Sequence, residues 1–219
     1  MTRRVPIPRS AGRPKDADSA ETRAKLLEGA RRIFNRDGYA ATTNRNVAAQ
    51  AGITPAAIYH YFASKAELYA AVVVDVDRLV HERFAPAART DGSLAERFSR
   101  VLEAAHELDM EDPSFAGFVV AIPTEVRRNP ELVALIPVDR VRTIPVVSEL
   151  VADAAAAGEF FDGVNPGDVE DLLSAVLSGL TVMTRFDDGN PRDSNAFRAL
   201  RRFLSGTLVH SNPVGGLRR

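Results

Sequence analysis

Three successive residues, Tyr59, His60 and Tyr61, carry polar-tipped rings on a segment too short to bury them all. Hydroxyl and ring N–H groups of this kind hydrogen-bond phosphate oxygens, which fixes the register of a protein on DNA without reading its sequence. Arg45 has the reach for a guanine edge or a phosphate, and Lys65 adds a charge for the DNA backbone. Alternatively, the two tyrosines are boundary residues of a helical core and His60 is merely solvated.

The segment over residues 43–68 must present these side chains, and its capping signals predict two short helices followed by a long one. Thr43 caps the first short helix, and Gly52 supplies the left-handed conformation that ends it. Thr54 caps the second helix, and Pro55 occupies its first position, where a missing N–H has no consequence. Two short helices joined by a glycine turn indicate a helix-turn-helix, whose second helix lies in the DNA major groove.

Small residues at the start of the second helix favour a close approach to DNA. Ala56 and Ala57 have short side chains, and their methyl groups, like the ring of Pro55, suit contact with thymine methyls. Ser64 and Glu67 form a capping box that opens the following long helix. The predicted DNA-contacting residues are Thr43, Arg45, Thr54, Pro55, Ala56, Ala57, Tyr59, His60, Tyr61 and Lys65.

Residues from about 20 to 70 resemble the DNA-binding domain of the TetR family of transcriptional regulators. The matching stretches are Ala41-Thr42-Thr43, Val47-Ala48, Ala51-Gly52-Ile53-Thr54, Ile58-Tyr59-His60-Tyr61-Phe62, Ser64-Lys65 and Glu67-Leu68. The resemblance implies an all-α homodimer with a three-helix DNA-binding domain, a C-terminal helical domain for ligand binding and dimerisation, and most often a repressor that a small molecule releases. Ala57 stands where many relatives carry a hydroxyl or glycine, which removes one expected phosphate contact.

Charge is divided unevenly along the chain. Residues 1–65 contain 12 Lys and Arg against 5 Asp and Glu, and the remainder contains 16 against 24, so the net charges are +7 and −8. A basic segment beside an acidic one is typical of a DNA-binding head on a body that does not contact DNA. The absence of cysteine excludes disulfides and thiolate metal sites and suits a reducing cytoplasm. No apolar run approaches the ~20 residues needed to span a membrane, and no signal peptide is predicted.

Helix-breaking residues divide the chain into regions of helical pattern, without repeats or strand-like alternation, so the predicted fold class is all-α. Pro123 is expected to kink or end its helix. The predicted helices outside the helix-turn-helix cover residues 18–37, 64–84, 93–109, 114–128, 138–157, 168–186 and 193–210. The predicted domains are a disordered basic arm (1–17), the DNA-binding domain (18–63), the effector-binding and dimerisation domain (64–210) and a frayed tail (211–219).

The basic arm admits two interpretations. It mixes arginines with prolines and cannot pack a core, so we expect it to be disordered when unbound. Gly12-Arg13-Pro14 resembles the centre of an AT-hook, whose arginine enters the narrow minor groove of A·T-rich DNA. The alternative, which we favour because a three-residue match is short, is a solvated tail that gives only non-specific, salt-sensitive attraction.

Apolar positions in the C-terminal half predict a dimer interface and an effector pocket. The 168–186 helix is apolar around too much of its circumference for one neighbour. The resemblance to the TetR family implies that this helix and the 193–210 helix pair with the same two helices of a second copy, as a two-fold four-helix bundle. A monomeric core built from the same residues is the alternative. The predicted interface residues are Leu172, Leu173, Val176, Leu180, Leu200, Phe203 and Leu204. The predicted pocket residues, which equally suit plain core, are Phe98, Leu102, His106, Met110, Phe115, Phe118, Val119, Ile122 and Met183.

Catalysis is not predicted, and neither a metal nor a cofactor is expected. His81-Glu82 and His106-Glu107 begin like the HExxH zinc motif, but the fifth positions are Ala85 and Met110. We expect a cytoplasmic regulator that binds a palindromic double-stranded operator as a homodimer and leaves it when a mostly hydrophobic effector changes the angle of the 64–84 connector. The alternatives are a ligand-independent regulator or an activator on the same scaffold, and a helical protein-interaction module.

Overall fold

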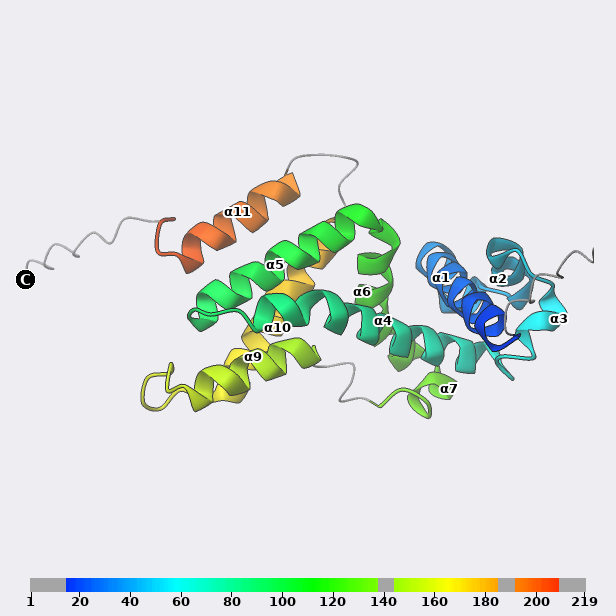
Figure 1. The fold of residues 1–219 in the computed structure, drawn as a ribbon, viewed down its shortest axis with the longest axis horizontal. Helices are drawn as coiled ribbons and strands as arrows, with labels where there is room; N and C mark the ends of the chain where they lie inside the picture. The colour runs from blue at the N-terminus through cyan, green and yellow to red at the C-terminus, as the bar shows by residue number, and fades with distance from the viewer. Residues whose placement is uncertain (1–14, 138–143, 185–191, 209–219) are drawn as a thin grey trace, which may run out of the picture.

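The computed structural model describes residues 15–137, 144–184 and 192–208, and every helix or strand it assigns in them is an α-helix, which confirms the all-α prediction (Figure 1). Three helices, α1 (Lys15–Ala41), α2 (Asn44–Ala51) and α3 (Pro55–Ile58), form one end of the molecule. From that end, α4 (Lys65–Ala88) leads into the C-terminal domain. The remaining helices are α5 (Leu94–Glu111), α6 (Pro113–Arg128), α7 (Pro130–Val133), α9 (Pro145–Ala156), α10 (Pro166–Thr184) and α11 (Arg192–Leu204).

Helix α1 begins earlier than predicted and is interrupted where predicted. It starts at Lys15 rather than at residue 18, because no glycine or proline follows Pro14 to prevent an earlier start. Gly38 breaks the helix with φ at 77°, a conformation that favours glycine, and one more helical turn leads to Ala41. Residues 1–14 of the predicted arm lie outside the described residues, so its disorder and its groove contacts stay predictions.

The C-terminal helices follow the predicted pattern with several differences. The helix predicted over residues 138–157 begins at Pro145, after the extended residue Ile144, and the short helix α7 was not predicted. The connector α4 runs to Ala88 instead of residue 84, and α11 ends at Leu204 instead of residue 210. Of the two outcomes expected for Pro123, a kink or an end of the helix, the end is excluded, since α6 continues through Pro123 to Arg128. Proline removes a single N–H donor, and this one lies on an exposed part of the helix, so the surrounding hydrogen bonds keep the helix continuous. The predicted tail over 211–219 and residues 138–143 lie outside the described residues.

Helix α6 joins the two ends of the molecule, because it packs against α1 of the DNA-binding domain and against α5 and α10 of the C-terminal domain. Buried rings of Phe34, Tyr39, Tyr69 and Phe118 meet there, with centroid distances of 4.9 Å for Phe34–Tyr69 and 5.1 Å for Tyr69–Phe118. The core is therefore continuous between the domains. None of the described helices has both the length and the apolarity of a membrane-spanning segment.

Candidate DNA interface and effector cavity

The α2–α3 segment has the capping geometry that its sequence predicts. The Thr43 side chain accepts a hydrogen bond from the Asn46 N–H at 3.2 Å, and the Thr54 side chain accepts one from the Ala57 N–H at 3.2 Å. Between the two helices, Gly52 has φ at 69°, in the left-handed region. These short-range contacts fix the turn of a helix-turn-helix.

The second helix of this motif is short but continues as a hydrogen-bonded turn. The N–H groups of Tyr61 and Phe62 both donate to the Ile58 carbonyl oxygen at 2.9 Å. Ile58 and Phe62 are buried, whereas Tyr59 is 61% exposed and His60 is also exposed. The turn therefore sorts its residues into a buried face and an outward face.

Most of the predicted DNA-contacting residues lie on the surface of the end of the molecule that α2 and α3 form (Figure 1). Partly buried members of the set are Ala57, Tyr61 and Lys65. The exposed members are Thr43, Arg45, Thr54, Pro55, Ala56, Tyr59 and His60.

The predicted phosphate contact of Lys65 does not fit the position of its side chain. Its Nζ donates to the carbonyl oxygens of Tyr39 at 2.7 Å, Ala40 at 3.3 Å and Thr42 at 3.1 Å, and it lies 4.3 Å from the centroid of the Tyr39 ring. An ammonium group has three N–H donors, and all three have acceptors here. Lys65 therefore caps the turn that follows Gly38 and holds the start of α4 against the end of α1.

The start of α4 also differs in detail from the predicted capping box. The Ser64 side chain accepts from the Glu67 N–H at 3.1 Å, as predicted. The Glu67 carboxylate, however, accepts from the Ala63 N–H at 2.9 Å instead of the Ser64 N–H. The carboxylate thus reaches one residue further and holds the chain that leaves the helix-turn-helix.

Arg23 of α1 is an additional candidate for DNA contact that no motif in the sequence indicates. Its guanidinium carbon lies 5.4 Å from the centroid of the Phe62 ring, and its side chain is exposed. Phe62 ends the recognition segment, which consists of α3 and the turn after it (residues 55–62). The two residues are far apart in sequence, so no local pattern predicts their contact. This position places the Arg23 guanidinium beside the end of the helix-turn-helix.

A buried ion pair joins α1 to the start of α6. Nη2 of Arg31 lies 2.5 Å from Oδ2 of Asp112, and Arg31 is only 7% exposed. Asp112 also caps α6, since its Oδ1 accepts from the Ser114 N–H at 3.1 Å. The guanidinium carbon of Arg31 lies 4.9 Å from the centroid of the Phe115 ring. The ion pair, the helix cap and the contact of Arg31 with the Phe115 ring therefore lie together between the domains.

Two tyrosines buried along the same junction have raised pKa values. Burial, reinforced by the negative charge of Glu131 and a hydrogen bond to it, raises the pKa of Tyr39 to about 12. Burial, with a smaller contribution from Glu125, raises the pKa of Tyr69 still further. Both phenols are therefore neutral at physiological pH and act as packing residues.

A cavity of about 300 Å³ lies within the C-terminal domain, between α4, α5, α6, α10, α11 and the start of α9. Most of its lining is apolar, including Phe84, Phe115 and Phe197. Among the described residues, its hydrogen-bonding side chains are those of Asp77, Asp109, Ser178 and Thr181. Its volume and its few polar groups are those of a small-molecule site.

The structure divides the predicted pocket residues into two groups. Phe115, Val119 and Ile122, all on α6, line the cavity as predicted. The others do not line it, because helical periodicity identifies an inward face without showing which inward residues meet a void. Phe98, Leu102 and Phe118 are core residues at 1%, 0% and 1% exposure, whereas Met110 and Met183 point outward at 72% and 52%.

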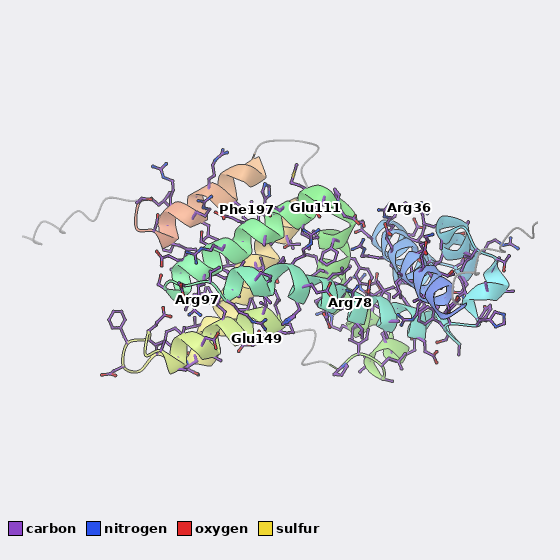
Figure 2. All side chains as sticks on the ribbon, viewed as in Figure 1. Arg36, Arg78, Arg97, Glu111, Glu149 and Phe197 are labelled. Atoms are coloured by element: carbon purple, nitrogen blue, oxygen red, sulfur yellow. The ribbon has the colours of Figure 1, made fainter. Side chains whose placement is uncertain are left out.

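The predicted pocket residue His106 packs instead against a cavity-lining ring. Its ring centroid lies 5.1 Å from that of Phe197. Figure 2 labels Phe197 where α11 approaches α5. The other HExxH-like histidine, His81, has its Nδ1 3.9 Å from a Glu149 carboxylate oxygen. In the part of the chain that the structure describes, no three His, Asp or Glu side chains gather as a metal ion requires.

The predicted dimer residues are also divided. Leu173 and Leu180 are buried within the protomer, so they belong to its own core. Leu172 and Phe203 are 59% and 62% exposed, and partly buried residues lie beside them on α10 and α11. The partly buried predicted members are Val176, Leu200 and Leu204.

Two known families match this chain along most of its length. Residues 26–72 match the family described as bacterial regulatory proteins of the tetR family. Residues 94–209, more than half of the chain, match the C-terminal domain of BetI-type transcriptional repressors. The chain is also similar to the HTH-type transcriptional regulator UidR of Escherichia coli K12, with 23% identity over 194 residues that cover 89% of this chain and 96% of UidR.

Solved structures show the same fold. The FadR regulator of Bacillus subtilis, in complex with stearoyl-CoA, superimposes with a TM-score of 0.67 at 14% identity and covers 85% of this chain and 99% of FadR. A TetR-family regulator from Pectobacterium atrosepticum gives a TM-score of 0.60 at 28% identity, over 91% of this chain and 100% of that one.

Proposed function

The chain belongs to the TetR family of DNA-binding transcriptional regulators, and from that premise we propose that it is a repressor that an effector releases from a palindromic operator. The family is one of regulators and not of enzymes. The repressor assignment is supported by the C-terminal match, whose description names transcriptional repressors. A protein that acts on the chromosome in this way works in the cytoplasm.

The outward face of the helix-turn-helix carries the DNA-binding part of the proposal. Tyr59 and His60 are exposed on the turn that follows Thr54 and Pro55, and Arg45 is exposed on α2. Tyrosine and histidine suit phosphate contacts, and arginine suits a guanine edge or a phosphate. Because the set has few long base-reading side chains, phosphate contacts and close methyl contacts contribute as much as direct base readout.

The exposed apolar residues of α10 and α11 are proposed to form the dimer interface. Leu172, Met183 and Phe203 are all more than half exposed, which is unfavourable for large apolar side chains unless a partner covers them. Covering them with the same face of a second copy gives a two-fold, four-helix contact. A dimer also supplies the two recognition helices that an inverted repeat requires.

The cavity in the C-terminal domain is proposed as the effector site. Its apolar walls suit a small, mostly apolar molecule, and the carboxylates of Asp77 and Asp109 suit a hydrogen-bond donor on it. The solved complex of FadR with stearoyl-CoA supports a small-molecule effector in this fold. The effector releases DNA only if it binds the DNA-incompetent state more tightly than the other.

Selection of bound duplexes from random DNA tests the DNA-binding part. We expect an inverted repeat whose half-sites lie about one helical turn, or a multiple of it, apart. Arg45→Ala should weaken binding of that duplex by about 1–3 kcal/mol. Arg89→Ala is the matched control, because Arg89 lies at the opposite end of α4 from the helix-turn-helix. Equal losses in the two variants would place the DNA-binding face elsewhere.

A cavity-filling substitution tests the effector site. Val119→Phe narrows the cavity from α6, whereas Val133→Phe adds the same ring on the exposed surface of α7. Small molecules that stabilise the wild-type protein against heat should lose that effect in Val119→Phe alone. Retained stabilisation in Val119→Phe would show that such molecules bind outside the cavity.

A further inference from the structure

One aromatic ring belongs both to the effector cavity and to the contact between the domains. Phe115 is 4% exposed and lines the cavity, and its ring also lies 4.9 Å from the guanidinium carbon of Arg31 on α1. A molecule that fills the cavity therefore contacts a ring on which part of the DNA-binding domain rests. A displacement of the Phe115 ring therefore changes the packing of the Arg31 guanidinium, which belongs to the DNA-binding domain.

Arg31 cannot adjust independently of α6. It is 7% exposed, and separating its charge from Asp112, 2.5 Å away, is strongly unfavourable because it leaves a buried charge without its partner. Asp112 is itself fixed to the first turn of α6 by hydrogen bonds from the N–H and the hydroxyl of Ser114, at 3.1 and 2.5 Å. Arg31 therefore moves together with the start of α6.

Two further contacts between α1 and α6 follow along the chain. A Cβ atom at Gly117 would lie 1.9 Å from Oδ1 of Asn35, so the two helices approach closely one turn beyond Arg31. One turn further, the Tyr39 N–H donates to Oε1 of Glu125 at 3.3 Å. The contacts at Arg31 and Asn35 are spaced by one helical turn, and the contact at Tyr39 follows the break at Gly38, so α1 and α6 stay in contact on both sides of that break.

The far side of α1 holds the helix-turn-helix. A Cβ atom at Gly29 would lie 3.3 Å from the Ala51 nitrogen, and α1 packs against α2. A shift of α1 therefore carries α2 and, through the fixed turn at Gly52, the recognition segment. The chain of contacts from cavity to DNA face does not require a bend in α4.

We propose that Phe115 and Arg31 transmit effector binding to the DNA-binding domain, with α6 carrying α1, in addition to any change in the angle of α4. The inference rests on the proposed function, because it takes the cavity as the effector site. Phe115 lines the cavity, whereas Arg31 does not, and neither residue belongs to the proposed DNA-contacting set. Both are therefore assigned a role in coupling the two sites. Substitution at this contact should therefore uncouple two binding events without removing either.

Phe115→Leu and a matched control test the assignment. The leucine keeps an apolar cavity wall and removes the ring beside Arg31. Phe84→Leu is the control, because Phe84 is an equally buried cavity residue of α4, at 5% exposure. The probe for the cavity is N-phenyl-1-naphthylamine, an uncharged fluorescent amine, and the probe for the head is the duplex selected from random DNA. The measurement is the dissociation constant of the dye with and without saturating duplex.

In the wild-type protein and in Phe84→Leu, duplex should raise the dissociation constant of the dye about 5- to 150-fold, the usual range of coupling between two sites. In Phe115→Leu the factor should fall below about 2-fold. The factor compares the same variant with and without duplex, so a change in the affinity of Phe115→Leu for the dye alone does not alter this expectation. Equal factors in the two variants would overturn the inference. Arg31→Lys, which keeps the charge beside Asp112 but loses the planar group, should reduce the factor as well, and it decides the question if Phe115→Leu does not fold.

Failure of the proposed function has a different signature. If the wild-type protein does not bind the dye, or if Val119→Phe binds the dye as tightly as the wild-type protein does, the cavity is not an effector site. The inference then falls together with the proposed function. If the wild-type protein binds the dye in the cavity but duplex leaves the dissociation constant unchanged, the inference is contradicted while DNA binding and the cavity both stand.

Discussion

The DNA-binding end and the C-terminal domain are both helical, yet their shapes depend on contacts of very different range along the chain. Thr43 and Thr54 cap the helices of the head through N–H groups three residues away, and Gly52 turns the chain between them. The cavity is instead enclosed by residues that extend from Val73 to Phe197 and come from six helices and from Ile144, which precedes α9. Substitutions at these caps therefore act through single local bonds, whereas those around the cavity act through shared packing.

The largest effect is expected where the two regions meet. Asp112→Ala removes the partner of the buried Arg31 and one helix cap, so the free energy of unfolding should fall by about 3–5 kcal/mol. Urea denaturation followed by circular dichroism measures it. Glu82→Ala is the control, since Glu82 forms an exposed pair with Arg78 at 2.7 Å, and such pairs contribute about 0–1 kcal/mol. Similar losses in both variants would contradict a special role for the junction.

A smaller effect should separate a structural lysine, Lys65, from Arg45, which is proposed to contact DNA. Lys65→Met should lower the free energy of unfolding by about 1.5–3 kcal/mol, because three carbonyl groups lose a charged donor. It should leave the salt dependence of duplex binding unchanged. Arg45→Ala should do the opposite, keeping stability and reducing the slope of log affinity against log salt by about 1 if it contacts a phosphate. A reduced slope in Lys65→Met would restore Lys65 as a phosphate contact.

A glycine pair tests how strictly the head depends on local conformation. Gly52→Ala should destabilise the protein by about 1–2 kcal/mol, because φ at 69° disfavours a side chain although nothing lies within 4 Å of the added atom. Gly167→Ala, in the first turn of α10, has no positive φ and should be neutral or slightly stabilising. Thermal or urea unfolding distinguishes the two, and equal effects would show that the turn tolerates another conformation.

The smallest effect at neutral pH is expected for Tyr69→Phe. The Tyr69 hydroxyl is buried with no hydrogen-bond partner among the described residues, so its removal should leave stability unchanged or slightly higher. At alkaline pH the unfolded chain loses the phenol proton near pH 10, while burial holds the pKa of folded Tyr69 well above that. Stability is therefore lost as pH rises above about 10, and Tyr69→Phe should reduce this slope by up to about 1.4 kcal/mol per pH unit. Tyr59→Phe, at an exposed site, is the control, and an unchanged slope in Tyr69→Phe would contradict the burial argument.

The sequence predicted those features whose causes lie within a few residues. The caps at Thr43 and Thr54 and the turn at Gly52 are of this kind, and all three are confirmed. The predicted contact of Lys65 with the DNA backbone fails because its acceptors are carbonyl groups 23 to 26 positions earlier in the chain. They lie on a turn that exists only because Gly38 breaks α1. Nothing in its local pattern indicates that turn.

The cavity shows the same limit in the C-terminal domain. Phe98 and Phe115 occupy similar apolar positions on neighbouring helices, yet the first is plain core and the second borders a void. Asp77 and Asp109 were overlooked because a charged residue is ordinarily assigned to the solvent side of a helix. Which residues face a cavity depends on how several helices pack together, and that information is spread over the whole chain.

The most direct test of the account measures the affinity of the wild-type protein for its selected duplex before and after the cavity is filled with N-phenyl-1-naphthylamine. Dye fluorescence reports when the cavity is occupied, and light scattering reports whether the dimer persists. The account predicts that filling the cavity weakens duplex binding about 5-fold or more while the dimer stays intact. An unchanged affinity with the cavity full would contradict it.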